Sequence, residues 1–199
     1  MDAGSLKVEN ARFILTVDEE RRILTDGAIL VEDGVISAVG KTADLAAAGA
    51  DHTIDATDMV VTPGFTNGHM HISYAHAVRG IFPDDVKDRL AYVFQMQLVM
   101  TAEEERDTSL LAAVELLKGG TTNVVDPGST KHIEACLDAY DQAGIRVVTG
   151  EHVTDHENDT NLPVYDAPEA IRRMEETVER FDGGLDGRVR SWAMPFSAA

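Results

Sequence analysis

Cysteine is almost absent from this sequence, since Cys136 is the only one in 199 residues. A single thiol excludes an intrachain disulfide, and it argues against a metal site built from cysteines. The sequence also lacks any run of about 18 apolar residues of the kind that crosses a membrane. Its first residues, MDAGSLKVEN, have neither the basic region nor the apolar segment of a secretory signal. These absences predict a cytoplasmic protein that does not enter the membrane.

Positive charge is scarce as well. The chain carries 35 Asp and Glu residues against 17 Lys and Arg, which gives a formal net charge of −18, and only five of the basic residues are lysines. A surface of this sign repels nucleic acids and anionic membranes, so we expect neither as a partner. Because salt screens such self-repulsion, the composition also suggests a protein adapted to high salt.

The residues that are present favour a globular fold that begins with β-strands. Hydrophobic residues make up 44% and charged residues 26% of the sequence, as in ordinary globular domains. Residues 7–40 contain short apolar runs, and an Asp33-Gly34 turn between two of them predicts a β-hairpin. A further strand is expected at residues 53–56.

From Thr101 onward the pattern becomes regular. Thr101 and Glu104 predict the capping box of a helix that ends at Gly119. Strands and amphipathic helices then alternate, and this alternation predicts βα units on a parallel sheet. The apolar face expected for the first helix comprises Leu110, Ala113, Val114 and Leu117. The expected strands are residues 121–125, 145–149 and 189–196, and the other expected helices are residues 129–143 and one that begins near 166–169.

The stretch Met59–His71, MVVTPGFTNGHMH, carries the clearest chemical signal. Residues 60–62 predict a strand, which a Pro-Gly pair breaks, and His69 and His71 follow. In an extended chain, residues two apart point to the same side, so both imidazoles can face one ion. Imidazole is the commonest protein ligand of metals such as zinc. The pair therefore predicts half of a metal site, against the alternative of two unrelated surface histidines.

The flanks of this pair carry a family resemblance. The string Pro-Gly-Phe-x-Asn-x-His-x-His resembles the motif at the first barrel strand of the amidohydrolase superfamily, in particular its deaminase and triazine-hydrolase branch. Arg79-Gly80 and residues 116–122 resemble further parts of the family pattern. The similarity spans most of residues 8–150.

The resemblance implies an α/β fold in two parts. Residues 1–60 would form part of a small N-terminal β-sandwich, and residues 61–199 the first half, about four βα units, of a (β/α)8 TIM-type barrel. It also implies that a third metal-binding histidine, a general-base glutamate and a metal-binding aspartate lie beyond residue 199. We therefore expect the 199 residues alone to bind metal weakly and not to turn over substrate.

The activity that the resemblance implies is that of a metal-dependent aminohydrolase. His69 and His71 would hold one divalent ion, with zinc expected first and iron or manganese as alternatives, and a water activated there would attack a heterocyclic small molecule. Residues 189–196 contain no lysine of the kind that bridges two metals, which favours a mononuclear site. The alternatives are a dechlorinating or amide-cleaving hydrolase on the same scaffold and a non-catalytic metal-binding βα protein.

Three further residues are candidates for contact with the substrate. Glu151 and His152 follow the strand expected at 145–149, where the loops of a barrel carry function, and His76 lies close to the metal motif. Asp126 is expected to cap the helix that follows it. A half barrel would leave open strand edges, which predict self-association into a homo-oligomer.

Overall fold

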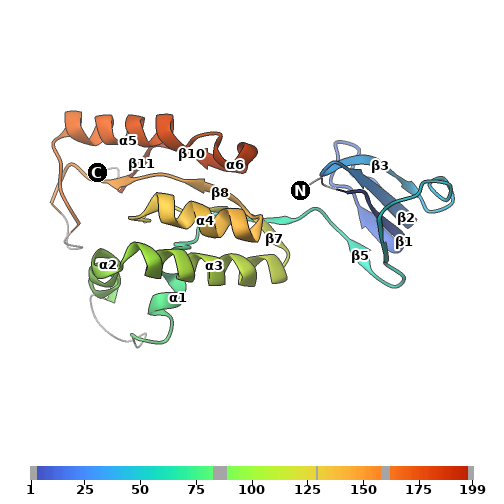
Figure 1. Ribbon diagram of the computed structural model, residues 1–199, viewed down its shortest axis with the longest axis horizontal. Helices are drawn as coiled ribbons and strands as arrows, with labels where there is room; N and C mark the ends of the chain where they lie inside the picture. The colour runs from blue at the N-terminus through green and yellow to red at the C-terminus, as the bar shows by residue number, and fades with distance from the viewer. Residues whose placement is uncertain (1–3, 83–88, 129, 158–161, 197–199) are drawn as a thin grey trace. The chain divides into compact units, whose positions relative to one another are not determined.

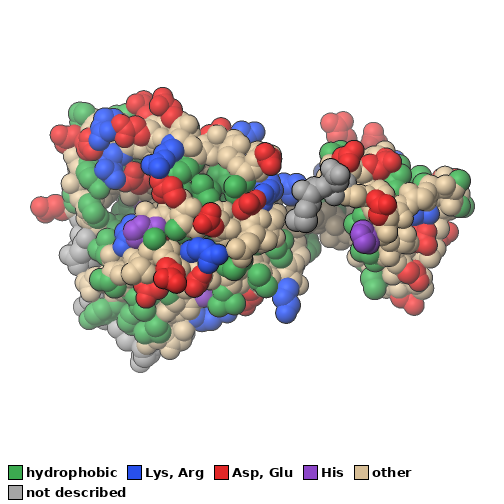
Figure 2. Space-filling view, viewed as in Figure 1, with side chains coloured by type: hydrophobic (Ala, Val, Ile, Leu, Met, Phe, Trp, Pro, Cys, Tyr) green, Lys and Arg blue, Asp and Glu red, His purple; other side chains and the backbone are tan. Residues whose placement is uncertain are grey.

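The computed structural model in Figure 1 describes residues 4–82, 89–128, 130–157 and 162–196. The chain divides into two compact units, Met1–Pro63 and Gly64–Ala199. Among the described residues, no helix is long and apolar enough to span a membrane. Acidic side chains are spread over the visible face of each unit, in agreement with the net charge of −18 (Figure 2).

The N-terminal unit is a five-stranded sheet. Its strands are β1 (Leu6–Leu15), β2 (Ile23–Glu32), β3 (Val35–Lys41), β4 (His52–Asp55) and β5 (Val60–Val61). The order is β3-β2-β1-β4, with β5 also paired to β1; β4 and β5 run parallel to β1, and the other pairs are antiparallel. Asp33 and Gly34 both have positive φ, 51° and 77°, as a two-residue hairpin turn requires, so the predicted hairpin is confirmed. The buried core comprises Ala11, Ile14 and Ala56.

The C-terminal unit is built on a parallel sheet. Its four strands are β6 (Phe65–Asn67), β7 (Thr121–Val125), β8 (Arg146–Thr149) and β10 (Val189–Ser191), in the order β10-β8-β7-β6. All three neighbouring pairs are parallel. Two short strands, β9 (His152–Val153) and β11 (Met194–Pro195), form a further parallel pair. The parallel arrangement predicted from the alternation of strands and helices is therefore confirmed.

Helices accompany this sheet, and α3, α5 and α6 contact its strands. They are α1 (Ala75–Val78), α2 (Arg89–Val99), α3 (Ala102–Lys118), α4 (Ile133–Ala143), α5 (Ala167–Phe181) and α6 (Gly184–Gly187). The predicted capping box is present at the start of α3, where the side chains of Thr101 and Glu104 each bond to the backbone of the other. Gly144 ends α4 in the left-handed conformation, with φ 76°. The apolar core of the unit comprises Ile72, Ala112, Ala113, Val124, Cys136, Tyr140, Ile145 and Val147.

Two predicted strands differ from the structure. Val60 and Val61 form a strand, but it pairs with β1 in the N-terminal unit, and β6 is the strand that leads to the histidines. The break falls at Pro63, which has no N–H to continue a ladder. The strand expected at 189–196 is split into β10 and β11. The neighbouring stretch of chain is divided in the same way into β8 and β9, and Gly150 lies between them. A Cβ atom at Gly150 would come within 2.3 Å of the carbonyl oxygen of Trp192.

Two helix predictions also need correction. The helix expected at 129–143 begins at Ile133 in the structure, and Ser129 lies outside the described residues. On α3, Val114 is 43% exposed, whereas Ser109 and Ala112 are fully buried, so the predicted apolar face is partly wrong. Small side chains on the buried face let α3 approach α4 closely, and this packing outweighs the hydrophobicity of single residues.

Candidate metal centre

The candidate metal ligands follow the end of strand β6. Asn67 is the last residue of this strand, and its side-chain oxygen accepts a hydrogen bond from the backbone N–H of His69 at 3.1 Å. The backbone N–H of Met70 donates to the carbonyl of Val125, at the end of β7, at 3.0 Å. The side chain of Met70 packs against the apolar core. The segment that carries both histidines is therefore fixed at the carboxyl end of the parallel sheet.

The two imidazole rings lie close together. Their centroids are 5.1 Å apart, and the rings meet edge to face at 88°. Burial lowers the pKa of His71 to about 4, because it disfavours the charged ring, and the charges of His69 and His152 lower it further. His71 is therefore neutral near pH 7, which is the form of imidazole that binds a metal.

A group of rings, which we call the ring cluster, joins His71 to residues far away in the sequence. Its members are His71, Tyr74, Phe94, His152 and Phe196. Phe94 of α2 is 5% exposed, and its ring centroid lies 6.5 Å from that of His71 and 6.4 Å from that of Tyr74. The Phe94 ring also lies 5.8 Å from that of Phe196, which is in turn 4.6 Å from the ring of His152. The cluster thus connects α2, β9 and the end of β11 to the metal motif.

The structure brings His152, but not its neighbour Glu151, toward the metal motif. Burial lowers the pKa of His152 to about 4, so its ring is neutral near pH 7. A neutral imidazole has one donor and one acceptor nitrogen. His152 can therefore offer either kind of hydrogen bond to a small molecule at the ring cluster.

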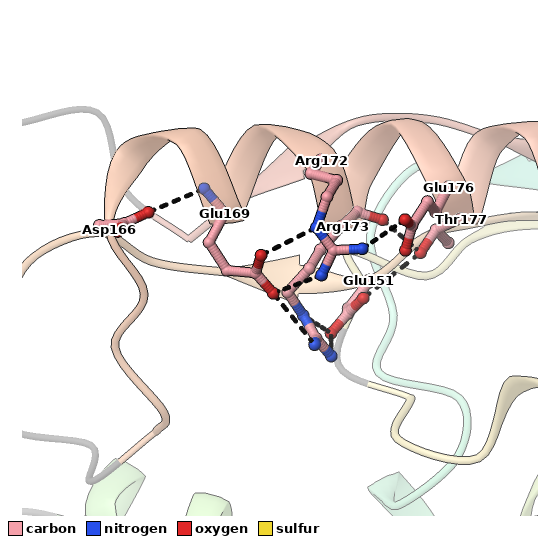
Figure 3. A network of polar contacts seen from close by, with 7 residues as sticks. All are labelled: Glu151, Asp166, Glu169, Arg172, Arg173, Glu176 and Thr177. Carbon is pink, nitrogen blue, oxygen red and sulfur yellow. Dashed lines mark hydrogen bonds and ion pairs between the residues drawn. The ribbon is translucent and has the colours of Figure 1, made fainter.

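Glu151 points to helix α5 (Figure 3). Its Oε1 accepts a hydrogen bond from Nε of Arg173 at 2.8 Å, and its Oε2 accepts one from the hydroxyl of Thr177 at 3.4 Å. Arg173 also lies over the ring of Tyr165, with 4.6 Å between its guanidinium carbon and the ring centroid. These contacts place Glu151 in the attachment of α5 to the end of β8.

His76, the third predicted substrate contact, lies on α1. Its Nε2 forms a hydrogen bond with the carboxylate of Glu115 on α3, and Arg79 binds the same carboxylate at 3.1 Å. Hydrogen bonds from Arg79 and His76 lower the pKa of Glu115. The structure thus places the His76 side chain in the contact between α1 and α3.

The described residues supply only part of the donor set that a metal needs. No group of three or more His, Cys, Asp or Glu side chains in these parts of the chain is arranged to hold an ion. His69 and His71 offer two imidazoles, one of which burial keeps neutral. The pair fits as two of the ligands of a divalent metal, of which a zinc site typically has four.

The position of the pair agrees with a known class of enzyme, since βα barrels hold their active sites at the carboxyl ends of their strands. Comparison with known proteins gives the family. Residues 60–199 match the amidohydrolase family, and residues 27–48 match the imidazolonepropionase-like composite domain of bacteria. The first match covers more than half of the chain, so the chain belongs to the amidohydrolase family.

Its relatives include deaminases of adenosine derivatives. The chain is 32% identical over 149 residues to a 5-methylthioadenosine/S-adenosylhomocysteine deaminase of Haloarcula marismortui, covering 74% of this chain and 33% of that protein. It is 28% identical over 192 residues to a 5'-deoxyadenosine deaminase of Methanosarcina barkeri, covering 94% of this chain and 41% of that protein. The chain therefore spans less than half the length of these relatives.

Solved structures of the same fold come from two kinds of hydrolase. A triazine hydrolase from Arthrobacter aurescens has a TM-score of 0.77 at 21% identity, covering 94% of this chain and 45% of that one. Guanine deaminase from E. coli has a TM-score of 0.72 at 18% identity, covering 94% and 44%. These similarities confirm the predicted fold, in which a small N-terminal β unit precedes the first βα units of a barrel.

Proposed function

We propose that this protein acts in a metal-dependent aminohydrolase reaction, in which an activated water displaces the amino group of a heterocyclic small molecule. The observation that carries the proposal is the histidine pair, with rings 5.1 Å apart, fixed at the carboxyl end of a parallel sheet beside the ring cluster. The names of the relatives support a purine nucleoside as the class of substrate.

His69 and His71 would hold the metal through neutral ring nitrogens. Zinc is expected first, with iron or manganese as alternatives, and an atrazine chlorohydrolase with a TM-score of 0.73 was solved with zinc. A divalent ion at such a site supplies hydroxide, because it lowers the pKa of a bound water to about 7. The hydrogen bond that the His69 N–H donates to Asn67, and the one that the Met70 N–H donates to the carbonyl of Val125, would keep both rings in place before the metal arrives.

The ring cluster would bind the heterocycle. Faces or edges of Tyr74, Phe94 and Phe196 suit a flat aromatic ring, and they would keep water from the reacting side of the site. His152 would donate or accept one hydrogen bond. Glu151 and His76 stay predictions as substrate contacts, and their bonds to Arg173 and Glu115 in this structure support an indirect role through α5 and α1.

The proposal also includes a second candidate reaction, self-association of the chain and a cellular location. A dechlorinating or amide-cleaving hydrolase is the second candidate, supported by the shared fold of the triazine hydrolase, and release of ammonia rather than chloride separates the two. Self-association through the outer strands β6 and β10 is part of the proposal, as is a cytoplasmic location, in keeping with the buried, unpaired thiol of Cys136.

Metal content tests the proposal directly. Elemental analysis of the longest form of the gene product would compare the wild type with a variant carrying both His69→Ala and His71→Ala, after exposure to zinc and removal of the excess. We expect bound zinc in the wild type, up to about one ion per chain, and a loss of at least about tenfold in affinity in the double variant.

The matched control is His52→Ala, because His52 lies in β4 of the N-terminal unit. This variant should bind zinc as the wild type does. Ammonia release from a panel of purine nucleosides by the longest form of the gene product would test the reaction. A wild type without zinc, or a double variant that keeps it, would remove the basis of the proposal.

A further inference from the structure

Helix α5 binds the turn of chain that carries His152. Glu151, the residue before His152, accepts a hydrogen bond at Oε1 from Nε of Arg173 at 2.8 Å, and Nη2 of Arg173 binds the same oxygen (Figure 3). The hydroxyl of Thr177, one helical turn further along α5, donates to Oε2 of Glu151 at 3.4 Å. The side chains of Arg173 and Glu151 are 33% and 26% exposed, so water screens their ion pair less than a pair on the open surface.

Arg173 also contacts the chain on the other side of His152. Its guanidinium carbon lies 4.6 Å from the centroid of the Tyr165 ring. The backbone N–H of Tyr165 donates to the carbonyl of Thr154 at 3.0 Å, and Thr154 forms an isolated parallel bridge with Val164. Thr154 lies two residues after His152. A single side chain of α5 is therefore joined to the residue before His152 directly and to the segment after it through Tyr165.

The backbone ladder at His152 is short. Strand β9 has only two residues, His152 and Val153, and its partner β11 has two as well. The backbone N–H of Phe196 adds one bond to the carbonyl of Val153 at 2.8 Å. A pairing of this size is marginal by itself. The place of the His152 ring, whose centroid lies 4.6 Å from that of Phe196, therefore depends also on the side chains that bind this turn.

We infer that Arg173 is a positioning residue of the proposed substrate site, which directs the His152 ring into the ring cluster by binding Glu151 and Tyr165. The inference rests on the proposed function, because it concerns the hydrogen bond that His152 would make to the heterocycle. A loosened turn would let the ring leave the position in which its donor or acceptor nitrogen meets the substrate. Arg173 itself does not need to touch the substrate.

Kinetics of the longest form of the gene product with a purine nucleoside test the inference. Arg173→Met removes the donor groups and keeps an unbranched apolar side chain beside Tyr165. We expect KM to rise about tenfold with kcat within about twofold of the wild type, because a hydrogen bond lost in both the ground state and the transition state weakens binding alone. A merely structural role would instead lower the amount of folded enzyme, so the apparent kcat would fall and KM would stay unchanged.

A second readout needs neither metal nor turnover. With 13C-labelled histidine and phenylalanine rings, the same form of the protein should show nuclear Overhauser contacts between His152 and Phe196, because their ring centroids lie 4.6 Å apart. Arg173→Met should weaken these contacts at least about twofold, since a mobile ring spends less time at close range. Unchanged contacts overturn the role of Arg173 even in an active enzyme. Weakened contacts in a protein that releases no ammonia support this role, although the proposed reaction itself then fails.

Two further variants complete the test. Arg172→Met is the matched control, because Arg172 lies beside Arg173 on α5 but pairs with Glu169 and Glu176, and it should keep the KM and the ring contacts of the wild type (Figure 3). Glu151→Ala should reproduce Arg173→Met, and the two changes together should have no larger effect than Arg173→Met alone, because both act through one ion pair. Additive effects, or a raised KM in Arg173→Met without one in Glu151→Ala, would mean that Arg173 acts on the substrate directly and overturn the inference. An equal effect of Arg172→Met also overturns it.

Discussion

Replacing Glu105 by alanine should destabilise the C-terminal unit strongly. The Glu105 side chain of α3 is fully buried, and its carboxylate accepts hydrogen bonds from the backbone N–H groups of His132 at 2.7 Å and Lys131 at 3.3 Å. These groups directly precede α4, whose N-cap residue, His132, makes no side-chain cap bond of its own. Glu105 therefore caps α4 from a neighbouring helix, and its removal leaves buried donors unpaired.

The size of the effect follows from these contacts. A hydrogen bond to a charged acceptor contributes about 1.5–3 kcal/mol, the longer bond adds about 0.5 kcal/mol, and the buried methylenes contribute about 0.8 kcal/mol each. Relief of the buried charge acts in the opposite direction. We expect Glu105→Ala to lower the free energy of unfolding by about 2–4 kcal/mol.

The contribution of Glu105 to the free energy of unfolding depends on pH, and the raised pKa of this residue gives the sign of the dependence. Burial raises the pKa of Glu105 above its ordinary value of 4.5, although the N–H groups of His132 and Lys131 oppose this. A raised pKa in the folded state gives a contribution to stability that is complete below the unfolded pKa and declines as pH rises through the folded pKa. Glu105→Gln removes this dependence. The unfolding free energy of the wild type should therefore fall relative to that of Glu105→Gln as the pH rises above about 4.5.

Urea unfolding followed by circular dichroism measures both effects. Glu103→Ala is the matched control, because Glu103 lies in the same first turn of α3 but is exposed. That substitution should change the unfolding free energy by about 0.5 kcal/mol or less. If Glu105→Ala differed from Glu103→Ala by under about 0.5 kcal/mol, the assignment of Glu105 as the cap of α4 would be refuted.

Three other predictions concern charge, the thiol and the ring cluster. Raising salt from about 0.1 M to about 1 M shortens the screening length from about 10 Å to about 3 Å, so a chain of net charge −18 should gain stability in thermal melts, and a flat or falling melting temperature would contradict this. Burial raises the pKa of Cys136 to about 12, so a thiol reagent at pH 8 should leave the native chain unlabelled and label it fully in guanidinium; fast native labelling would contradict the buried position. Phe94→Ala should lower the unfolding free energy by about 3 kcal/mol in urea, against little change for the exposed Tyr92→Ala, and equal effects would mean that Phe94 is not central to the packing.

Local signals in the sequence determine much of the fold. Asp33-Gly34 specifies a turn with two positive φ angles, and Thr101 with Glu104 specifies a helix start, because both depend on residues a few positions apart. The parallel sheet follows from alternation over longer stretches. The face of α3 could not be predicted in the same way. It depends on how closely Ser109 approaches Cys136, at 3.3 Å, and that contact joins residues 27 positions apart.

In the candidate site, too, only the features that depend on residues close together in the sequence could be predicted. The histidine pair was visible in the sequence because its two members are two residues apart on a chain that leaves a strand. Phe94 and Phe196 gave no signal, because their place beside His71 is set by the packing of α2 and by the end of β11. The signal that could have marked Phe94 was its position in an apolar stretch after the motif, but that stretch is equally typical of a core helix.

Glu151 and His152 show why neighbouring candidates must be separated by structure. Successive residues of an extended chain point to opposite sides, so one of the pair faces the ring cluster and the other faces α5. The alternation can be predicted from the sequence. Which of the two residues faces the ring cluster cannot, because the chain breaks its strand at Gly150 before β9 begins. The inward position holds a neutral imidazole with a pKa of about 4, and the outward position holds a carboxylate paired with Arg173. In the proposed site His152 would therefore present its ring to a ligand, whereas Glu151 is bonded to Arg173 of α5.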